Sequence, residues 1–188
     1  LSSSSAASDV YKRQAMNGEN VSNGTVNYSV HHNLFAHISH RFPSVTGNGF
    51  IDVINNVVYN FNLRLSIFFN NSKTNQVGNY WKGGPTSTKW YGARNKIGEY
   101  LAGHNEFNQP KVYTTGNILR HKDTNVDKDE DGWNDTFVIW RTMANQNATN
   151  PDTKYRSMIP FISPTLEFPV TTQDADHAYQ SVLSDVGA

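Results

Sequence analysis

Two arginines occupy equivalent positions after two asparagines in this chain of 188 residues. Arg41 lies eight residues after Asn33, and Arg64 lies eight residues after Asn56. Arg41 begins the sequence Arg-Phe-Pro, which follows a run rich in β-forming residues, so we expect it to project from a turn. A guanidinium group stays charged and presents a fork of donors that matches a carboxylate. Arg41 is therefore our first candidate for a catalytic group.

A second set of chemically capable residues is acidic. Aspartates stand at positions one, three, five and nine of a possible calcium loop, with Gly132 at position six; they are Asp127, Asp129, Asp131 and Asp135. Position twelve is Val138, where an EF-hand requires glutamate, so a complete EF-hand is not expected. The pattern predicts a structural calcium ion, and an acidic turn facing solvent is the alternative.

The elements that position these residues repeat along the chain. Asn33, Asn56 and Asn79 follow one another at intervals of 23 residues, each within a run of β-branched and aromatic residues. Asn117 continues the pattern after 38 residues, which indicates an insertion at residues 86–110. A fixed period of this size is typical of a solenoid, and short runs bounded by Gly, Asn and Pro indicate strands.

The asparagines indicate which solenoid this is. A stacked column of buried amides can satisfy the peptide groups that each turn leaves unpaired, and asparagine tolerates the left-handed backbone of a sharp turn. We therefore predict an all-β, right-handed parallel β-helix, with Asn33, Asn56, Asn79 and Asn117 as a structural ladder. Adjacent residues of a strand point to opposite faces, so His31 and His32 should not share one metal. We expect one of this pair inside the coil and one outside, and assign His32 a structural role.

The composition limits the classes of partner that this chain is expected to bind. The formal net charge is zero, no cysteine is present, and no apolar run approaches the roughly 20 residues that span a bilayer. Nothing here favours nucleic acid or an anionic membrane, and we expect a monomer. The absence of cysteine fits a cytosolic protein without excluding a secreted one.

The two ends differ from the repeats. Residues 1–14 are serine-rich and then basic, lack a signal-peptide pattern, and resemble a translated sequencing adapter; a disordered native linker is the alternative. We expect coils over residues 15–140, in a β-helix truncated at its N-terminal side. Residues 141–188 should form an irregular, proline-marked segment and a short helix packing on the coil, from Ala175 to about Ser184, with Asp174 as N-cap.

Several ordered motifs resemble the pectate lyases of polysaccharide lyase family one. They are His31-His32-Asn33-Leu34-Phe35, Arg41-Phe42-Pro43, residues 51–60, residues 75–85, and the tail at 178–188. The resemblance implies a secreted or periplasmic enzyme that cleaves polygalacturonate or pectin by calcium-assisted β-elimination, leaving 4,5-unsaturated oligogalacturonates. It also implies that Arg41 takes the C5 proton, with Pro43 fixing the turn. Since arginine is normally protonated, stabilisation of the enolate-like charge is the other role open to Arg41.

This chain departs from the family pattern in two places. A second arginine often follows the first by five residues, and here that position is Thr46. Arg64 is our candidate to replace it in substrate binding, because equivalent positions of adjacent coils lie about 4.8 Å apart. The family's calcium-binding acids and a substrate lysine precede the His-His-Asn repeat, and no counterpart is visible here, so we expect the fragment alone to be inactive. Asp52 lies between apolar neighbours and is no obvious calcium ligand.

Lys82 and Trp81 are further candidates for substrate binding. Lys82 precedes Gly83-Gly84-Pro85, and Trp81 could stack on a sugar ring, with packing in the core as the alternative for the tryptophan. Two other function classes stay open: a pectin lyase that needs no calcium, and a non-catalytic β-helix that binds polysaccharide. Hydrolysis is disfavoured because no pair of carboxylates recurs in register on the repeats.

Overall fold

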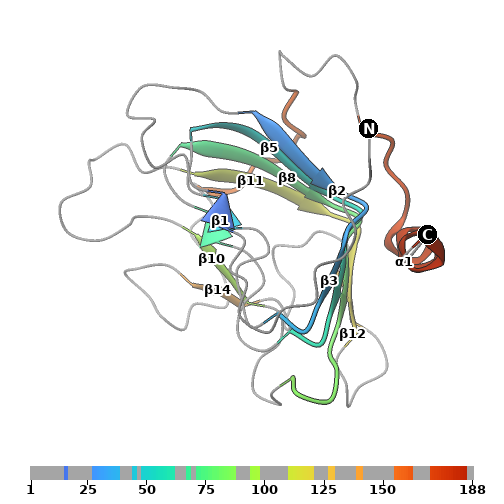
Figure 1. The fold of residues 1–188 in the computed structure, drawn as a ribbon. Helices are drawn as coiled ribbons and strands as arrows, with labels where there is room; N and C mark the ends of the chain where they lie inside the picture. The colour runs from blue at the N-terminus through green and yellow to red at the C-terminus, as the bar shows by residue number, and fades with distance from the viewer. Residues whose placement is uncertain are drawn as a thin grey trace.

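The chain winds into three β-sheets, parallel except for one strand, that surround an apolar interior (Figure 1). This computed structural model describes residues 15–16, 27–38, 44–45, 48–61, 67–68, 71–87, 94–97, 110–120, 127–129, 139–141, 155–162 and 170–185. No helix within these ranges is long and apolar enough to cross a membrane.

Strands from successive coils lie side by side in each sheet. The first sheet contains β1 (Ala15–Met16), β4 (Ser44–Val45), β7 (Ile67–Phe68), β10 (Arg94–Ile97) and β14 (Ile139–Arg141). The second contains β2 (Tyr28–His31), β5 (Gly49–Ile54), β8 (Ser72–Val77) and β11 (Lys111–Thr115). The third contains β3 (Leu34–Ala36), β6 (Val57–Tyr59), β9 (Tyr80–Lys82), β12 (Asn117–Arg120) and β13 (Asp127–Asp129).

The strand register reproduces the sequence repeat. Tyr28 pairs with Ile51, Ile51 with Thr74, and Thr74 with Val112, all in parallel. Only β13 runs antiparallel to its neighbour among the paired strands described. The prediction of a parallel β-helix is therefore confirmed. The segment predicted as an insertion contributes a strand of its own, since β10 pairs with β7 and β14 in the first sheet.

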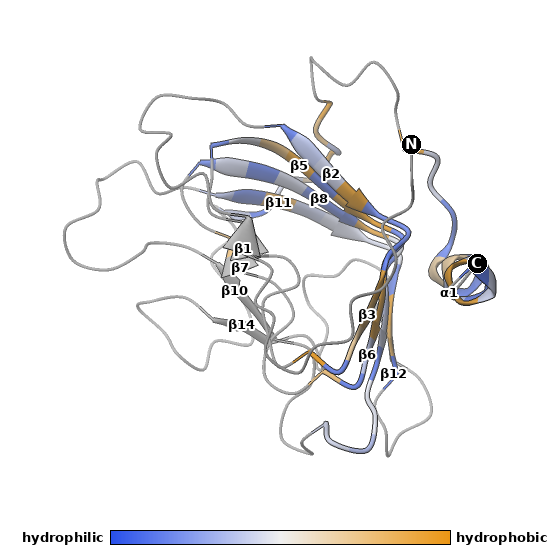
Figure 2. Ribbon diagram, viewed as in Figure 1, coloured by the Kyte–Doolittle hydropathy of each residue, from blue (hydrophilic) through white to orange (hydrophobic). Residues whose placement is uncertain are grey.

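Inward residues of β3, β6, β9 and β12 in the third sheet help to fill the interior. Phe35, Val58, Trp81 and Leu119 are all buried in one apolar cluster with the inward residues of β2 and β5. Figure 2 shows the apolar character of β3 and β6 and the hydrophilic corner where the second sheet meets the third. Trp81 is only 2% exposed, so the prediction that it binds substrate is wrong. Its indole lies on the core side of a strand whose next residue faces out.

A column of asparagines holds the corner between the second and third sheets. The side-chain Nδ2 of Asn33 donates to Oδ1 of Asn56 at 3.1 Å, that of Asn56 to Asn79 at 3.1 Å, and that of Asn79 to Asn117 at 2.9 Å. Each Oδ1 after the first also accepts the backbone N–H of the preceding member. The last three members are buried, so these bonds satisfy peptide groups that water cannot reach.

The residue before each ladder asparagine turns the corner in the left-handed region. His32 and Asn55 have φ of 53°, Gly78 has 60° and Gly116 has 65°. Because His32 belongs to this turn and not to the strand, its ring meets that of His31, with the two Nδ1 atoms 3.1 Å apart. The expectation of opposite faces, one inside the coil, is wrong: His31 is exposed and His32 is partly exposed. Burial, and then the neighbouring His31, lower the pKa of His32.

The C-terminal part packs on the outside of the coils. Helix α1 (Ala175–Asp185) lies against β6, β9 and β12 (Figure 1). It begins after Asp174, whose Oδ1 accepts the N–H of His177 at 2.9 Å. Two asparagines on the outside of the coils bind backbone of the segment that precedes α1. The Asn55 side chain bonds to the N–H and the carbonyl of Gln173, and the Asn75 side chain bonds to the same two groups of Phe161.

The side-chain amide of Asn75 also donates to Asp52, and the burial of this carboxyl group leads to a pH-dependent prediction. Asn75 Nδ2 donates to Asp52 Oδ1 at 2.8 Å, but burial outweighs this bond and raises the pKa of Asp52. The folded state then binds this proton more tightly than the unfolded state, so stability falls as pH rises through the raised pKa. Asp52→Asn removes the charge and keeps an acceptor for Asn75. We expect thermal melting to show a larger gain from the substitution at about pH 7 than at about pH 3; equal gains would contradict this account.

Candidate functional site

A row of outward side chains crosses the third sheet at the last residues of its strands. Ala36 pairs with Tyr59, Tyr59 with Lys82, and Lys82 with Arg120. All four residues are partly exposed, and neighbouring members of a sheet stand about 4.8 Å apart along the coil axis. The repeat therefore lines up an aromatic ring, an ammonium group and a guanidinium group on one face.

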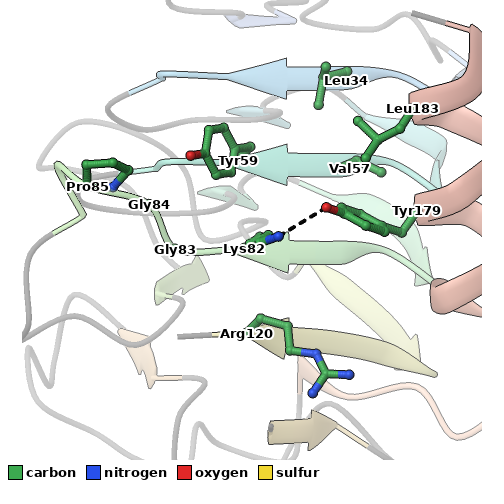
Figure 3. Close-up of a pocket in the computed structure, with 10 residues that line it drawn as sticks. All are labelled: Leu34, Val57, Tyr59, Lys82, Gly83, Gly84, Pro85, Arg120, Tyr179 and Leu183. Atoms are coloured by element: carbon green, nitrogen blue, oxygen red, sulfur yellow. Dashed lines mark hydrogen bonds between the residues drawn. The ribbon is translucent and has the colours of Figure 1, made fainter. Parts of the chain in front are cut away.

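Helix α1 covers the neighbouring row of outward side chains on the third sheet. It leaves the row of Tyr59, Lys82 and Arg120 open. Val57, Tyr80 and Ile118 form a buried cluster with Ala175 and Val182 of the helix. Between the helix and the open row lies a cavity of about 650 Å³, which we call the α1 groove (Figure 3). Tyr59, Lys82, Arg120 and Tyr179 contribute its polar atoms, and Leu34, Val57 and Leu183 its apolar wall. This volume lies within the ordinary range of ligand sites, about 300–1,000 Å³.

The rim of the α1 groove is backbone from Gly83, Gly84 and Pro85. Asn60 holds it: its Oδ1 accepts the N–H and the hydroxyl of Thr86, both at 2.9 Å. The backbone of Gly84 approaches Asn60 so closely that a Cβ there would lie 2.6 Å from Oδ1. A larger residue at position 84 would therefore displace the rim.

Lys82 is held in the α1 groove by Tyr179 of the helix. Its Nζ donates to the phenolic oxygen at 3.1 Å and lies 5.2 Å from the centroid of the same ring (Figure 3). The hydrogen bond to Tyr179, opposed by a smaller effect of burial, raises the pKa of Lys82. The ammonium group is therefore charged at neutral pH.

Arg120 lies one strand further along the row. Its Nε donates to the hydroxyl of Tyr80 at 3.0 Å, and its Nη2 lies 4.0 Å from Oδ1 of Asp176 on the helix. Tyr80 stacks on Tyr179 with centroids 4.3 Å apart, which joins the two cations through one aromatic pair. The α1 groove can thus bind an anionic group beside an aromatic surface.

The structure brings only part of the predicted site together. Lys82 lies in the α1 groove, while Trp81 points the other way into the core. Arg41, Arg64 and Pro43 lie outside the described residues. Their predicted roles therefore stay predictions.

The predicted calcium loop is described only in part. The backbone of Asp127 and Asp129 forms β13, paired with β12, where the sequence suggested a loop; Asp131 and Asp135 lie outside the described ranges. Within those ranges no group of three or more His, Cys, Asp or Glu side chains could hold a metal. Asp52 stands on its strand with Asn75 as its partner. The described residues thus do not fit a calcium ion, and no chemical step is assigned to one.

Sequence reasoning missed most of the α1 groove. Tyr59 and Arg120 stand three residues after Asn56 and Asn117, as Lys82 stands three residues after Asn79. This shared offset was visible in the repeat and would have placed them in one row. Tyr179 carries no such signal, because the helix docks from 97 residues further along the chain.

Comparison with known proteins finds similarity in structure. No protein-family model matches the chain. No curated protein matches it either. The structure is similar to the crystal structure of a pectate lyase from a Bacillus species in complex with trigalacturonate, with 16% sequence identity and a TM-score of 0.40. The match covers 85% of this chain and 40% of the solved chain, so the chain spans well under half of that lyase's length.

Proposed function

We propose that this chain is part of a pectate-lyase-type enzyme, which cleaves polygalacturonate by β-elimination. Three of the segments that resemble that family lie on successive coils of the β-helix. Residues 31–35, 54–58 and 77–81 each span one corner of the asparagine column and the strand that follows it. The fold and the ordered motifs support the proposal together, since a β-helix alone also serves proteins without catalytic activity.

The observation that carries the proposal is the equal length of two connections. Ala36 pairs with Tyr59 where β3 and β6 end, and Ser44 pairs with Ile67 where β4 and β7 begin. The chain therefore needs the same number of residues to pass from the third sheet to the first in both coils. Arg41 and Arg64 hold the same place in these two connections, five residues after the paired strand ends. Such a pair suits two acidic sugars of one polymer, because adjacent coils repeat at about 4.8 Å.

The chemistry requires a charge to be formed and dispersed. The C5 proton of a galacturonate is removed, the C4–O bond to the leaving sugar breaks, and the electron pair forms the C4–C5 double bond. The leaving oxygen takes up a proton. Arg41 serves this reaction either as the base or as the cation that stabilises the enolate-like charge before the bond breaks.

One assay separates the proposal from its rivals. The full-length protein is incubated with polygalacturonate in calcium, in excess chelator, and with methylated pectin, and absorbance of the unsaturated product is followed. We expect product from polygalacturonate in calcium and its loss on chelation. Product that survives chelation and is formed faster from methylated pectin would favour a pectin lyase. Binding of the polymer without product would favour a non-catalytic β-helix.

Arg64 provides the prediction for substrate binding. We expect Arg64→Ala in the full-length protein to weaken affinity for polygalacturonate by about ten-fold, since a hydrogen bond to a charged group contributes roughly 1.5–3 kcal/mol. Arg64→Lys should retain part of this affinity because it keeps the charge without the fork of donors. Binding is measured by titration calorimetry. Unchanged affinity of the alanine variant would show that Arg64 belongs to an ordinary loop.

A further inference from the structure

The α1 groove contains charge that the proposed elimination does not use. Lys82 and Arg120 hold adjacent places in the outward row of the third sheet. Within the described ranges, the nearest carboxylate partner is Asp176, which is 52% exposed and 4.0 Å from Arg120. The Lys82 ammonium is held by the phenolic oxygen of Tyr179. Lys82 and Arg120 are the charged residues among those that line the groove, and this described lining contains no carboxylate, so it is cationic.

The groove also selects the shape of its ligand. Tyr59 is the next member of the row beyond Lys82; it is partly exposed and is paired in register with Lys82. Leu34, Val57 and Leu183 continue this surface toward the helix (Figure 3). A small inorganic ion would use the cations and leave the aromatic and apolar walls in water. A ligand with an anionic group on a compact ring would contact both.

The row has a direction as well. Tyr59, Lys82 and Arg120 follow one another along the coil axis, at the roughly 4.8 Å repeat of adjacent strands. A linear polymer lying along this row would meet the aromatic ring first and the two cations next. Helix α1 forms one wall along the row, and the backbone of Gly83 and Gly84 forms a stretch of the opposite rim.

We infer that the α1 groove is a binding site for an acidic sugar, with the carboxylate between Lys82 and Arg120 and the pyranose ring against Tyr59. The anionic half of this inference stands on the contacts of the groove alone. The choice of a sugar rests on the proposed function, which would bring uronate polymers to this surface. The residues assigned to this site do not include Arg41, and they bind without bond breaking. It would hold a neighbouring part of the polymer while another part is cleaved.

The test is a binding titration of the 188-residue chain with trigalacturonate, with the neutral trisaccharide of galactose and with inorganic phosphate. We expect trigalacturonate to bind at least about ten-fold more tightly than either of the other two. Lys82→Met should weaken its binding by about ten-fold, and Lys82→Arg should restore it. Lys73→Met is the matched control, because Lys73 is an exposed lysine on β8 of another sheet, and it should change nothing.

Three results would overturn the inference. They are equal binding of the neutral trisaccharide, equal binding of phosphate, and unchanged affinity in Lys82→Met. Because Lys82 also holds α1, Arg120→Met serves as a second variant, and circular dichroism verifies that each variant keeps its fold. The proposed function fails separately: absent elimination by the full-length protein, with this binding intact, would remove the lyase and leave the site.

Discussion

Asn79→Ala is expected to lower the free energy of unfolding by about 3–5 kcal/mol, a large share of the 5–15 kcal/mol typical of a domain. Asn79 is 1% exposed and uses both ends of its amide. Its Oδ1 accepts from the backbone and side chain of Asn56, and its Nδ2 donates to Val53 O and to Asn117. Alanine would leave the buried Asn56 N–H without this acceptor, at a cost of roughly 1–3 kcal/mol, and would remove three further hydrogen bonds made by the amide.

Urea denaturation followed by circular dichroism measures this loss. Asn33→Ala is the matched control, because Asn33 ends the described part of the column and is partly exposed. It should cost clearly less than Asn79→Ala, since water can replace the missing amide there. Similar small losses in both variants would contradict the view that the column holds the corner of the coils.

Arg41→Ala is expected to slow β-elimination by the full-length protein at least about 100-fold, the usual effect of removing one group that stabilises developing charge. The rate should fall at saturating substrate, because the proposed contact forms with charge that exists only on the way to product. Arg41→Lys separates the two roles left open above. Lysine keeps a cation but loses its proton more readily than arginine, so a rate that rises with pH as the lysine deprotonates favours the base, and a rate that falls favours stabilisation of charge.

Arg64→Ala is the control for position, since Arg64 holds the same place one coil later. It should raise the substrate concentration needed for half-maximal rate and leave the maximal rate within a few-fold. Initial rates of unsaturated product measure both variants. A full rate in Arg41→Ala would remove this arginine from the chemistry.

The coil could be predicted because one residue type marks each turn. Asparagine recurs where a buried corner needs a side chain that both donates and accepts, so the spacing of Asn33, Asn56 and Asn79 carried the fold and its register. The position of Trp81 in the repeat would also have predicted that its side chain points into the core. Trp81 stands two residues after Asn79, where the other coils have Phe35, Val58 and Leu119. The error came from judging the tryptophan by residue type instead of by its place in the repeat.

Other features depend on contacts that a periodic pattern does not contain. His32 leaves the strand because the corner requires a left-handed residue, and its ring then faces His31. The outward asparagines Asn55 and Asn75 bind backbone of Gln173 and Phe161, more than 80 residues away in each case. The α1 groove exists only because the helix covers one outward row and leaves the next open.

The measurement that bears most directly on the lyase account is the chemistry of the product. Polygalacturonate treated with the full-length protein in calcium should release oligogalacturonates with a 4,5-double bond, seen as new absorbance and as fragments one water lighter than hydrolysis products. Saturated fragments that carry the added water would show hydrolysis, and an intact polymer would show no cleavage. Either result would contradict the proposal that this β-helix belongs to an eliminating enzyme.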